Sequence, residues 1–267
     1  MSLVLLASGP ADLRVFGARE GGETDLAAVF DAAAQADLVF VGERHDDAAS
    51  HGFELALLDA LAERGRPVVL AMEMFERDVQ PALDDYLAGR VDEAEMLART
   101  RPWPNYRTDY RPLVELARAR GWPVIAGNAP RALAARVARE GLAALETLPP
   151  AERAQAAAAL ECGEGAYREK FMAEMRQMAG HGGTADLDRL FEAQCVKDET
   201  MAESAAAGLA PGSTVVHVNG AFHSDEGLGV VERLRRRRPE VRALVVSIGQ
   251  GAPSPEGAAG DFVVWAP

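Results

Sequence analysis

The chain has 267 residues, of which 48% are hydrophobic, and its formal net charge is −13. This length and apolar content allow a sizeable core in one large α/β domain. The acidic balance opposes non-specific nucleic-acid binding, because phosphate contacts need a basic field. No apolar stretch of the sequence approaches the ~18 residues needed to cross a bilayer.

The first part of the chain alternates helix and strand patterns. An alanine-rich amphipathic segment at 26–36 precedes an apolar run at 38–41, and a helical segment at 47–64 precedes a second apolar run at 68–72. This alternation predicts βαβ units and a parallel sheet. The runs are almost uninterrupted, as expected for strands that helices cover on both faces.

The middle of the chain is mainly helical in pattern. Residues 79–120 are polar and helical, except for a predicted loop at 101–105 that contains two prolines, and a strand is expected at 123–126. Residues 131–208 hold few β-branched runs and predict several helices, with breaks at 148–150 and 180–183.

The α/β pattern then returns. We expect a strand at 214–218, a helix near 228–236 and a strand at 242–248, followed by a Gly- and Pro-rich tail and a last edge strand at 262–265. The predicted fold is α/β, a mostly parallel sheet flanked by helices with a large helical insertion. We expect one domain over 1–267, with a core at about 24–78, 121–135 and 212–267 and insertions at about 79–120 and 136–210.

Three smaller features have structural interpretations. Cys162 and Cys195 lack metal-finger or haem-attachment spacing; they allow one disulfide, but two buried unreactive thiols are favoured. The basic run Arg235–Arg238 ends a predicted helix, where it would complement the carboxyl end rather than form a binding patch. Met172, Met175 and Met178 fall on one helix face and are expected in the core.

Two histidines end the same motif in the same setting. Gly42-Glu43-Arg44-His45 and Gly220-Ala221-Phe222-His223 each follow an apolar run. Because ligands of open α/β sheets bind outside the carboxyl ends of parallel strands, the two motifs are predicted to meet at one site, with His45 and His223 facing one another.

Other predicted strands also finish in polar residues. Glu73 follows the second strand, and Asn128 and Arg131 follow the third. A carboxylate after a buried strand must be paired, metal-bound or lining a cavity, so Glu43 and Glu73 are expected in the site. Asn128 fits helix capping and ligand contact equally.

Some polar residues near the strands have a structural interpretation instead. Asp46 and Asp47 are favoured as helix N-caps. His217 lies inside its strand and is favoured as a hydrogen-bonded core histidine, with ligand contact as the alternative.

These residues suit more than one chemistry. Imidazole and carboxylate oxygens are ordinary ligands of divalent cations, so Glu43, His45, Glu73 and His223 are candidate metal ligands. The same four residues are candidate catalytic groups for hydrolysis, with a histidine as general base and a glutamate as proton donor. Aromatic residues around the 101–105 loop would instead wall a flat apolar ligand, and tyrosine is a known haem iron ligand.

Five ordered segments resemble one known family, the ChaN-like haem-binding uptake family of the Tiki/TraB/erythromycin-esterase superfamily. The segments are Val41-Gly42-Glu43-Arg44-His45-Asp46, Glu73-Met74-Phe75, Tyr110-Arg111-Pro112-Leu113, Gly127-Asn128-Ala129-Pro130-Arg131 and Gly220-Ala221-Phe222-His223. They run in order through most of the chain, from about residue 37 to residue 248.

The resemblance implies an α/β core with helical insertions and a site built on Glu43, His45, Glu73 and His223. In the hydrolytic branches of the superfamily such residues perform metal-dependent or general-base hydrolysis. In the ChaN branch they are associated with haem, a tyrosine iron ligand and pairing of two protomers.

For this chain the resemblance implies haem as cofactor and a role in haem or iron uptake. A divalent metal ion and a hydrolase, an esterase or peptidase, are the alternative. The expected haem-contacting residues are Tyr110, Tyr106, Asn128, Arg131 and His217, with Tyr110 as the first choice of iron ligand and Tyr106 as the second. The resemblance also implies that the protein forms a homodimer.

The sequence allows two predictions of the cellular location. The family suggests the cell envelope or periplasm. The opening segment at 1–7 has no basic region and too short an apolar core for a signal peptide, so the cytoplasm is the default for the chain as written.

Overall fold

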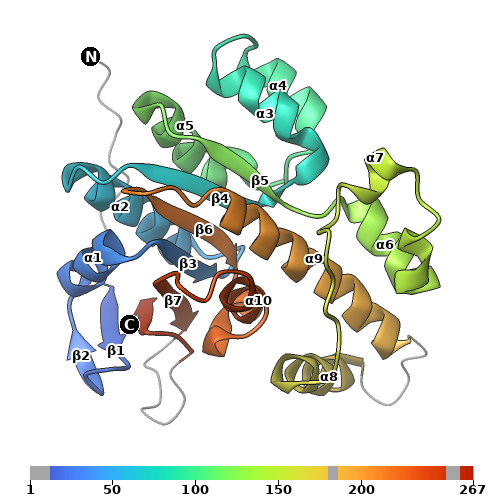
Figure 1. The fold of residues 1–267 in the computed structure, drawn as a ribbon. Coiled ribbons are helices and arrows are strands. Elements are labelled where there is room, and N and C mark those ends of the chain that lie inside the picture. Colours follow the sequence, from blue (N-terminus) through green and yellow to red (C-terminus); the bar gives the residue numbers. More distant parts are fainter. Residues whose placement is uncertain (1–12, 180–185, 251–258, 267) are drawn as a thin grey trace.

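The structure, a computed structural model, describes residues 13–179, 186–250 and 259–266. It is an α/β fold built on a mixed, mostly parallel sheet with the strand order β2-β1-β8-β7-β3-β6-β4-β5 (Figure 1). The strands are β1 Arg14–Gly17, β2 Gly22–Thr24, β3 Leu38–Glu43, β4 Val68–Glu76, β5 Val124–Asn128, β6 Thr214–Gly220, β7 Ala243–Gln250 and β8 Phe262–Ala266. The predicted fold class is therefore confirmed.

The helices follow the expected order along the chain. They are α1 Leu26–Gln35, α2 Ala48–Glu63, α3 Gln80–Leu87, α4 Glu93–Thr100, α5 Arg111–Arg120, α6 Arg131–Glu140, α7 Pro150–Arg153, α8 Ala166–Ala179, α9 Leu187–Ala207 and α10 Val230–Arg237. Short helical turns are η1 Arg77–Val79, η2 Tyr106–Tyr110, η3 Leu142–Leu145, η5 Ala221–His223 and η6 Asp225–Gly227. Throughout the described ranges, every helix is too short or too polar to cross a bilayer.

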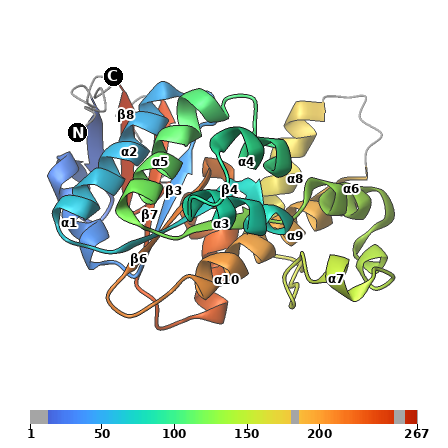
Figure 2. The same ribbon diagram turned by 90° about the horizontal axis from the view of Figure 1, so that it is seen from above.

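The central strands are buried on both faces because their side chains alternate between two cores. Val39 and Val41 of β3 belong to the larger core, which α1, α2, α3 and α5 cover. Leu38 and Phe40 of the same strand point to the opposite core, where they meet residues of α9 and α10. Helices thus lie on both sides of the sheet, as Figures 1 and 2 show.

The structure corrects two strand predictions. Residues 262–265 were expected at an edge, but β8 lies inside the sheet, parallel to β7 and antiparallel to β1. The edge on that side is formed by β1 and β2, whose short segments near the start of the chain were not predicted. The expected break at 180–183, the opening at 1–7 and the tail from 251 lie outside the described residues.

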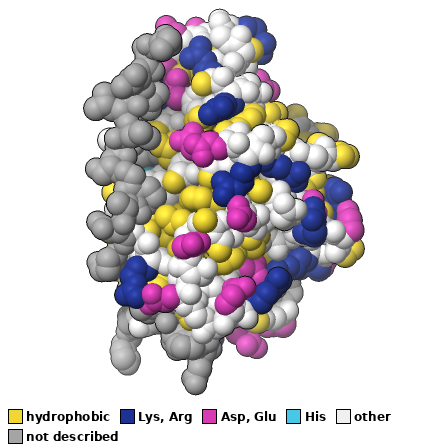
Figure 3. All heavy atoms as spheres, turned by 90° about the vertical axis from the view of Figure 1, so that its left-hand side faces the viewer, with side chains coloured by type: hydrophobic (Ala, Val, Ile, Leu, Met, Phe, Trp, Pro, Cys, Tyr) yellow, Lys and Arg dark blue, Asp and Glu magenta, His cyan; other side chains and the backbone are white. Residues whose placement is uncertain are grey.

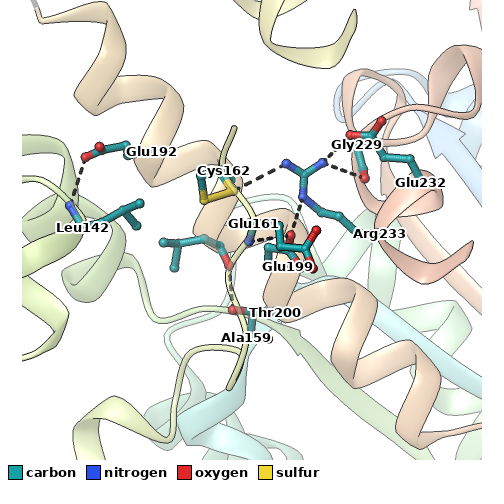
Figure 4. The surroundings of a disulfide bond; sticks show 12 residues. Leu142, Ala159, Glu161, Cys162, Glu192, Glu199, Thr200, Gly229, Glu232 and Arg233 are labelled. Atoms are coloured by element: carbon teal, nitrogen blue, oxygen red, sulfur yellow. Dashed lines mark hydrogen bonds and ion pairs between the residues drawn. A yellow bond between two sulfur atoms is a disulfide. The ribbon is translucent and has the colours of Figure 1, made fainter. Parts of the chain in front are cut away.

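The cysteine prediction was wrong. Cys162 and Cys195 form a disulfide that ties the segment before α8 to α9 (Figure 4). Beside it, the buried Arg233 of α10 pairs with Glu199, and its Nη2 lies 3.5 Å from the Cys195 sulfur. Sequence spacing alone cannot reveal this pairing, because the contact between the partly buried Cys162 and the buried Cys195 depends on how α9 packs.

Three of the four arginines in the basic run at the end of α10 pair with acidic residues within the fold. Arg236 and Arg237 both reach the buried carboxylate of Glu199, and Arg238 pairs with Glu240. This supports the structural interpretation of the run over a binding patch. On the face drawn in Figure 3, Lys and Arg side chains are likewise interspersed with Asp and Glu.

The methionine prediction holds only in part. Met172 is buried and Met175 is partly buried, whereas Met178 is 78% exposed. A spacing of three residues advances the side chain by less than a full turn, so the third methionine has rotated away from the core.

Candidate functional site

The two Gly-x-x-His motifs lie side by side at the carboxyl ends of β3 and β6. These strands pair in parallel, with Gly42 opposite Asn219 and Glu43 opposite Gly220. A Cβ atom on Gly42 would lie 3.1 Å from Ala221 Cα of the second motif, and one on Gly220 would lie 2.8 Å from the His45 ring of the first. Each glycine therefore leaves room for the other motif, which explains why both motifs need one.

The first motif places a half-exposed histidine over a buried carboxylate. His45 Nδ1 lies 2.6 Å from Glu43 Oε1, and the Tyr110 hydroxyl donates to the same oxygen at 2.8 Å. The His45 side chain is 44% exposed, and its ring meets Trp103 edge to face at 4.8 Å. Within the described residues, His45 Nε2 has no hydrogen-bond partner.

The second motif places a buried histidine between two carboxylates. His223 Nδ1 lies 2.6 Å from Asp198 Oδ1 of α9, and its Nε2 lies 3.3 Å from Glu73 Oε1. The other Glu73 oxygen accepts a hydrogen bond from the Gly220 amide at 2.7 Å. Glu73 lies where the register between β4 and β5 shifts, a local irregularity that turns its side chain toward β6.

The charges of this site reinforce one another. Burial works to lower the pKa of His223, but Glu73 and Asp198 outweigh it and raise that pKa to about 10. Burial likewise opposes ionisation of Glu73, yet His223 and His45 hold the pKa of Glu73 well below its usual range. For His45, burial is outweighed by Glu43 and Glu73, so its pKa is raised. The pKa shifts of both groups thus favour a buried ion pair between Glu73 and His223 at neutral pH.

These groups open into a pocket of about 280 Å³ with mostly polar walls. Its lining residues are His45, Glu73, Glu76, Trp103, Asn128, Ala129, Arg131, Lys197 and His223. The structure thus brings together four strand ends, as the sequence indicated. Of the nine predicted site residues, His45, Glu73, His223, Asn128 and Arg131 line the pocket, and Glu43 lies directly beneath His45.

The other predicted ligand residues lie behind the pocket wall. Tyr110 is fully buried, and burial together with Glu43 raises its pKa far above the usual range. Tyr106 is also buried, packed edge to face on Phe75. His217 is a core histidine, as favoured, with Nδ1 2.9 Å from Asn219 Oδ1, and burial lowers its pKa to about 4.

Two ambiguous polar positions also have clear structural roles. Asp47 caps α2 by accepting from the amides of Ala49 and Ser50, which confirms its N-cap role. Asn128 does not cap α6, because the N-cap position is Pro130; its side chain instead accepts from the Ala129 amide at the edge of the pocket.

Sequence reasoning missed several residues around the site. Asp198 and Lys197 lie on α9, far along the chain from either motif, and only packing brings them to His223 and the pocket. His51 and Glu54 of α2 lie beneath Glu43. The spacing of three between His51 and Glu54 places them on one helix face, a signal that the sequence did contain.

The predicted set of four metal ligands is not gathered as a cation cage. Both His223 nitrogens face carboxylates, so both carry protons and neither offers a lone pair. Over residues 13–179, 186–250 and 259–266, the grouping with ligand-sized separations is Glu43, His51 and Glu54.

The fold and the site together define an α/β protein with a ligand pocket at the carboxyl ends of its parallel strands. Residues 29–234 match the family described as haem-binding uptake, Tiki superfamily, ChaN, and the chain belongs to this family. The family resemblance seen in the sequence is thereby confirmed.

Solved structures share the fold. ChaN of Campylobacter jejuni, whose structure describes cofacial haem binding, superposes with a TM-score of 0.73 at 15% identity, covering 95% of this chain and 96% of that one. A mutant erythromycin esterase in its open conformation has a TM-score of 0.51 at 14% identity, covering 89% and 78%. At these identities the likeness shows the fold alone.

A curated plant protein is also similar. Protein RETICULATA-RELATED 5, chloroplastic, of Arabidopsis thaliana is 26% identical over 254 residues, which are 88% of this chain and 34% of the relative. The chain therefore spans about a third of the length of this curated relative.

Proposed function

We propose that the chain binds haem or a related iron porphyrin at this pocket and serves haem or iron uptake. Membership of the haem-binding family supports the ligand class. The observation in the structure that favours it most is His45, which lines the pocket beside Trp103: its Nδ1 is held by Glu43, and its Nε2 has no hydrogen-bond partner among the described residues.

The residues at the pocket fit a haem whose iron would be bound by a histidine. When one imidazole nitrogen binds a metal, the other ordinarily donates a hydrogen bond to a carboxylate, and this bond orients the ring. For His45 the carboxylate is that of Glu43. All four tyrosines of the chain are buried, and the Tyr110 hydroxyl is engaged by Glu43. In this conformation His45 therefore replaces the tyrosine expected from the resemblance as the iron ligand. Bound haem would supply the iron centre, and His45 would hold it.

The cationic side chains at the pocket suit the carboxylates of a porphyrin. Lys197 and Arg131 both line it, and the Arg131 side chain is 75% exposed, with a distant 3.9 Å contact to Glu76. A propionate could displace that long contact at little cost, because exposed ion pairs contribute about 0–1 kcal/mol.

The size of the pocket bears on the oligomeric state. Its volume of about 280 Å³ lies just below the usual range of ligand pockets, ~300 to ~1,000 Å³. A porphyrin seated on His45 would extend beyond the pocket and leave much of one face uncovered. We therefore propose a homodimer in which a second protomer covers this face.

The disulfide supports a proposed location in the cell envelope or periplasm. Disulfides persist in oxidising compartments and are rare where thiols are kept reduced. Cys162 and Cys195 are paired in the structure, so an oxidising compartment suits the chain better than the cytoplasm.

Hemin titration of the purified protein tests this function. We expect a saturable Soret shift at one haem per chain, with binding weakened at least ~10-fold by His45→Ala because the residue that would hold the iron is lost. Tyr110→Phe should leave the Soret band unchanged. Lys197→Gln should weaken binding modestly, whereas the charge-matched Lys170→Gln should not, because Lys170 pairs with Glu226 away from the pocket.

Two results would overturn the proposal. The absence of any Soret shift would exclude haem binding. Loss of the shift in Tyr110→Phe with retention in His45→Ala would show that tyrosine is the ligand after a rearrangement of the site. Sedimentation with and without hemin checks the dimer.

A further inference from the structure

A second polar cluster lies beneath the pocket, in the space between β3 and α2. Glu43, His51 and Glu54 are 2%, 8% and 1% exposed, and one ligand atom from each lies within 4.8 Å of the others. His51 Nδ1 is 3.2 Å from Glu43 Oε2 and 3.3 Å from Glu54 Oε2. The haem proposal uses none of the facing atoms, because His45 and Tyr110 contact the other Glu43 oxygen, Oε1.

The hydrogen bonds available do not satisfy this cluster. His51 Nδ1 can donate one proton, and its hydrogen bond goes to Glu54. Within the described residues, Glu43 Oε2 and Glu54 Oε1 are buried and accept no hydrogen bond, although Glu43 Oε2 lies 3.2 Å from His51 Nδ1. Two buried carboxylates with unpaired oxygens are costly unless a proton or a cation neutralises them.

We propose that Glu43, His51 and Glu54 bind a divalent transition-metal cation, separate from the haem pocket. Ligands ~2.1 Å from one ion are ~3.0–3.4 Å apart in octahedral or tetrahedral geometry, and both distances from His51 Nδ1 fall in this range. One imidazole nitrogen and two carboxylate oxygens suit Zn²⁺, Mn²⁺ or Fe²⁺. With neutral His51, the two carboxylates balance the charge of one divalent ion.

The surroundings orient these ligands as in a metal site. His51 Nε2 lies 3.3 Å from the His45 carbonyl oxygen and 3.6 Å from Asp109 Oδ2, so Nε2 can keep its proton while Nδ1 gives up its own and turns its lone pair to a cation between the carboxylates. The Tyr110 hydroxyl fixes Glu43 through Oε1 and leaves Oε2 for the cation. The Tyr110 ring also packs edge to face on His51 at 5.0 Å.

The same arrangement links the cation to His45. Glu43 would bind the cation through Oε2 and His45 through Oε1, so an ion in the cluster holds the carboxylate that orients the pocket histidine. Loss of the cation would loosen His45 without removing any residue of the pocket.

The test uses tag-free, full-length protein stripped with a chelator and titrated separately with Zn²⁺, Mn²⁺ and Co²⁺. We expect one ion per chain by elemental analysis after desalting, a rise in thermal midpoint, and visible d–d absorption with Co²⁺. Glu54→Gln, which keeps the shape of the side chain, should weaken binding at least ~10-fold. Its metal-free thermal midpoint should stay the same or rise, because one buried charge is gone, which shows that it folds.

Glu73→Gln is the matched control, since Glu73 lies in the pocket but not in the cluster. It should keep the ion. Failure of all three ions to bind at one per chain, binding unchanged in Glu54→Gln, or equal loss in Glu73→Gln would each overturn the proposal. Hemin binding is measured on the same samples, so failure of the metal site and failure of the haem proposal are told apart.

Discussion

The buried ion pair at His223 makes a quantitative prediction for Asp198→Asn. The asparagine keeps the size of the side chain and an acceptor oxygen near Nδ1, but it removes a charge that lies 2.6 Å from the ring. The pKa of His223 rises from 6.5 to about 10, and at ~1.36 kcal/mol per pH unit the surroundings of the ring favour its protonated form by ~5 kcal/mol. Asp198 is one of two carboxylates responsible.

The sign of the pH effect follows from linkage. Because the pKa of His223 is raised in the folded state, its contribution to stability is complete below pH 6.5 and is lost as the pH rises through about 10. A charged hydrogen bond contributes ~1.5–3 kcal/mol. Asp198→Asn should therefore lower the free energy of unfolding by ~2–3 kcal/mol at pH 7 and by clearly less at pH 10.

Urea unfolding of both proteins at pH 7 and pH 10 measures this difference, and NMR titration of the His223 ring gives its pKa directly. Asp188→Asn is the control on the same helix, since its 72%-exposed carboxylate pairs with Arg168 at the surface and should change stability by less than ~1 kcal/mol. An equal loss at both pH values in Asp198→Asn would refute the ionic account of this site.

Three further perturbations have definite expectations. Cys195→Ala should lower the free energy of unfolding by ~2–4 kcal/mol, as judged from urea midpoints, and a midpoint unchanged by the substitution would contradict a structural disulfide. Gly220→Ala should displace the His45 ring and weaken the Soret shift at a stability cost of ~1–3 kcal/mol, while Gly52→Ala in α2, where a Cβ meets nothing, should leave hemin binding intact. Burial raises the pKa of Asp225 to about 6, so the contribution of this carboxyl group to stability falls as the pH rises from 4 to 6. The difference in unfolding free energy between the wild type and Asp225→Asn should therefore change by up to ~3 kcal/mol over this range, and a difference that does not change with pH would argue against it.

The core of the fold was predictable because its strands are apolar runs whose two ends are clear in the sequence. The strand predicted at 38–41 is longer in the structure by only two residues, Gly42 and Glu43, which belong to the first motif. Strands β1 and β2 escaped prediction because they are three or four residues long, and β2 is hardly apolar. The place of β8 depends on its pairing with β1, which no local pattern encodes.

The candidate site likewise has one part that local sequence pattern predicts and another that depends on packing. Glu43, His45, Glu73 and His223 sit at strand ends, and parallel strands bring their carboxyl ends to one edge, so their convergence follows from local pattern. Asp198 reaches His223 from the middle of a 21-residue helix, and no sequence signal separates it from the other acidic residues of α9. Which carboxylate turns inward depends on the packing of that helix.

The structure also separates the roles of two histidines that the sequence made equivalent. His223 contacts a carboxylate with each nitrogen, so both protons are held in place and the ring acts as a buried cation that positions Glu73. His45 contacts a carboxylate with one nitrogen only and is half exposed. A ligand atom needs a lone pair and access, and within this pair only His45 has both. The Gly-x-x-His motif therefore supplies a backbone that lets two strand ends approach, while the chemistry of each histidine is set by Glu43 on one side and Asp198 on the other.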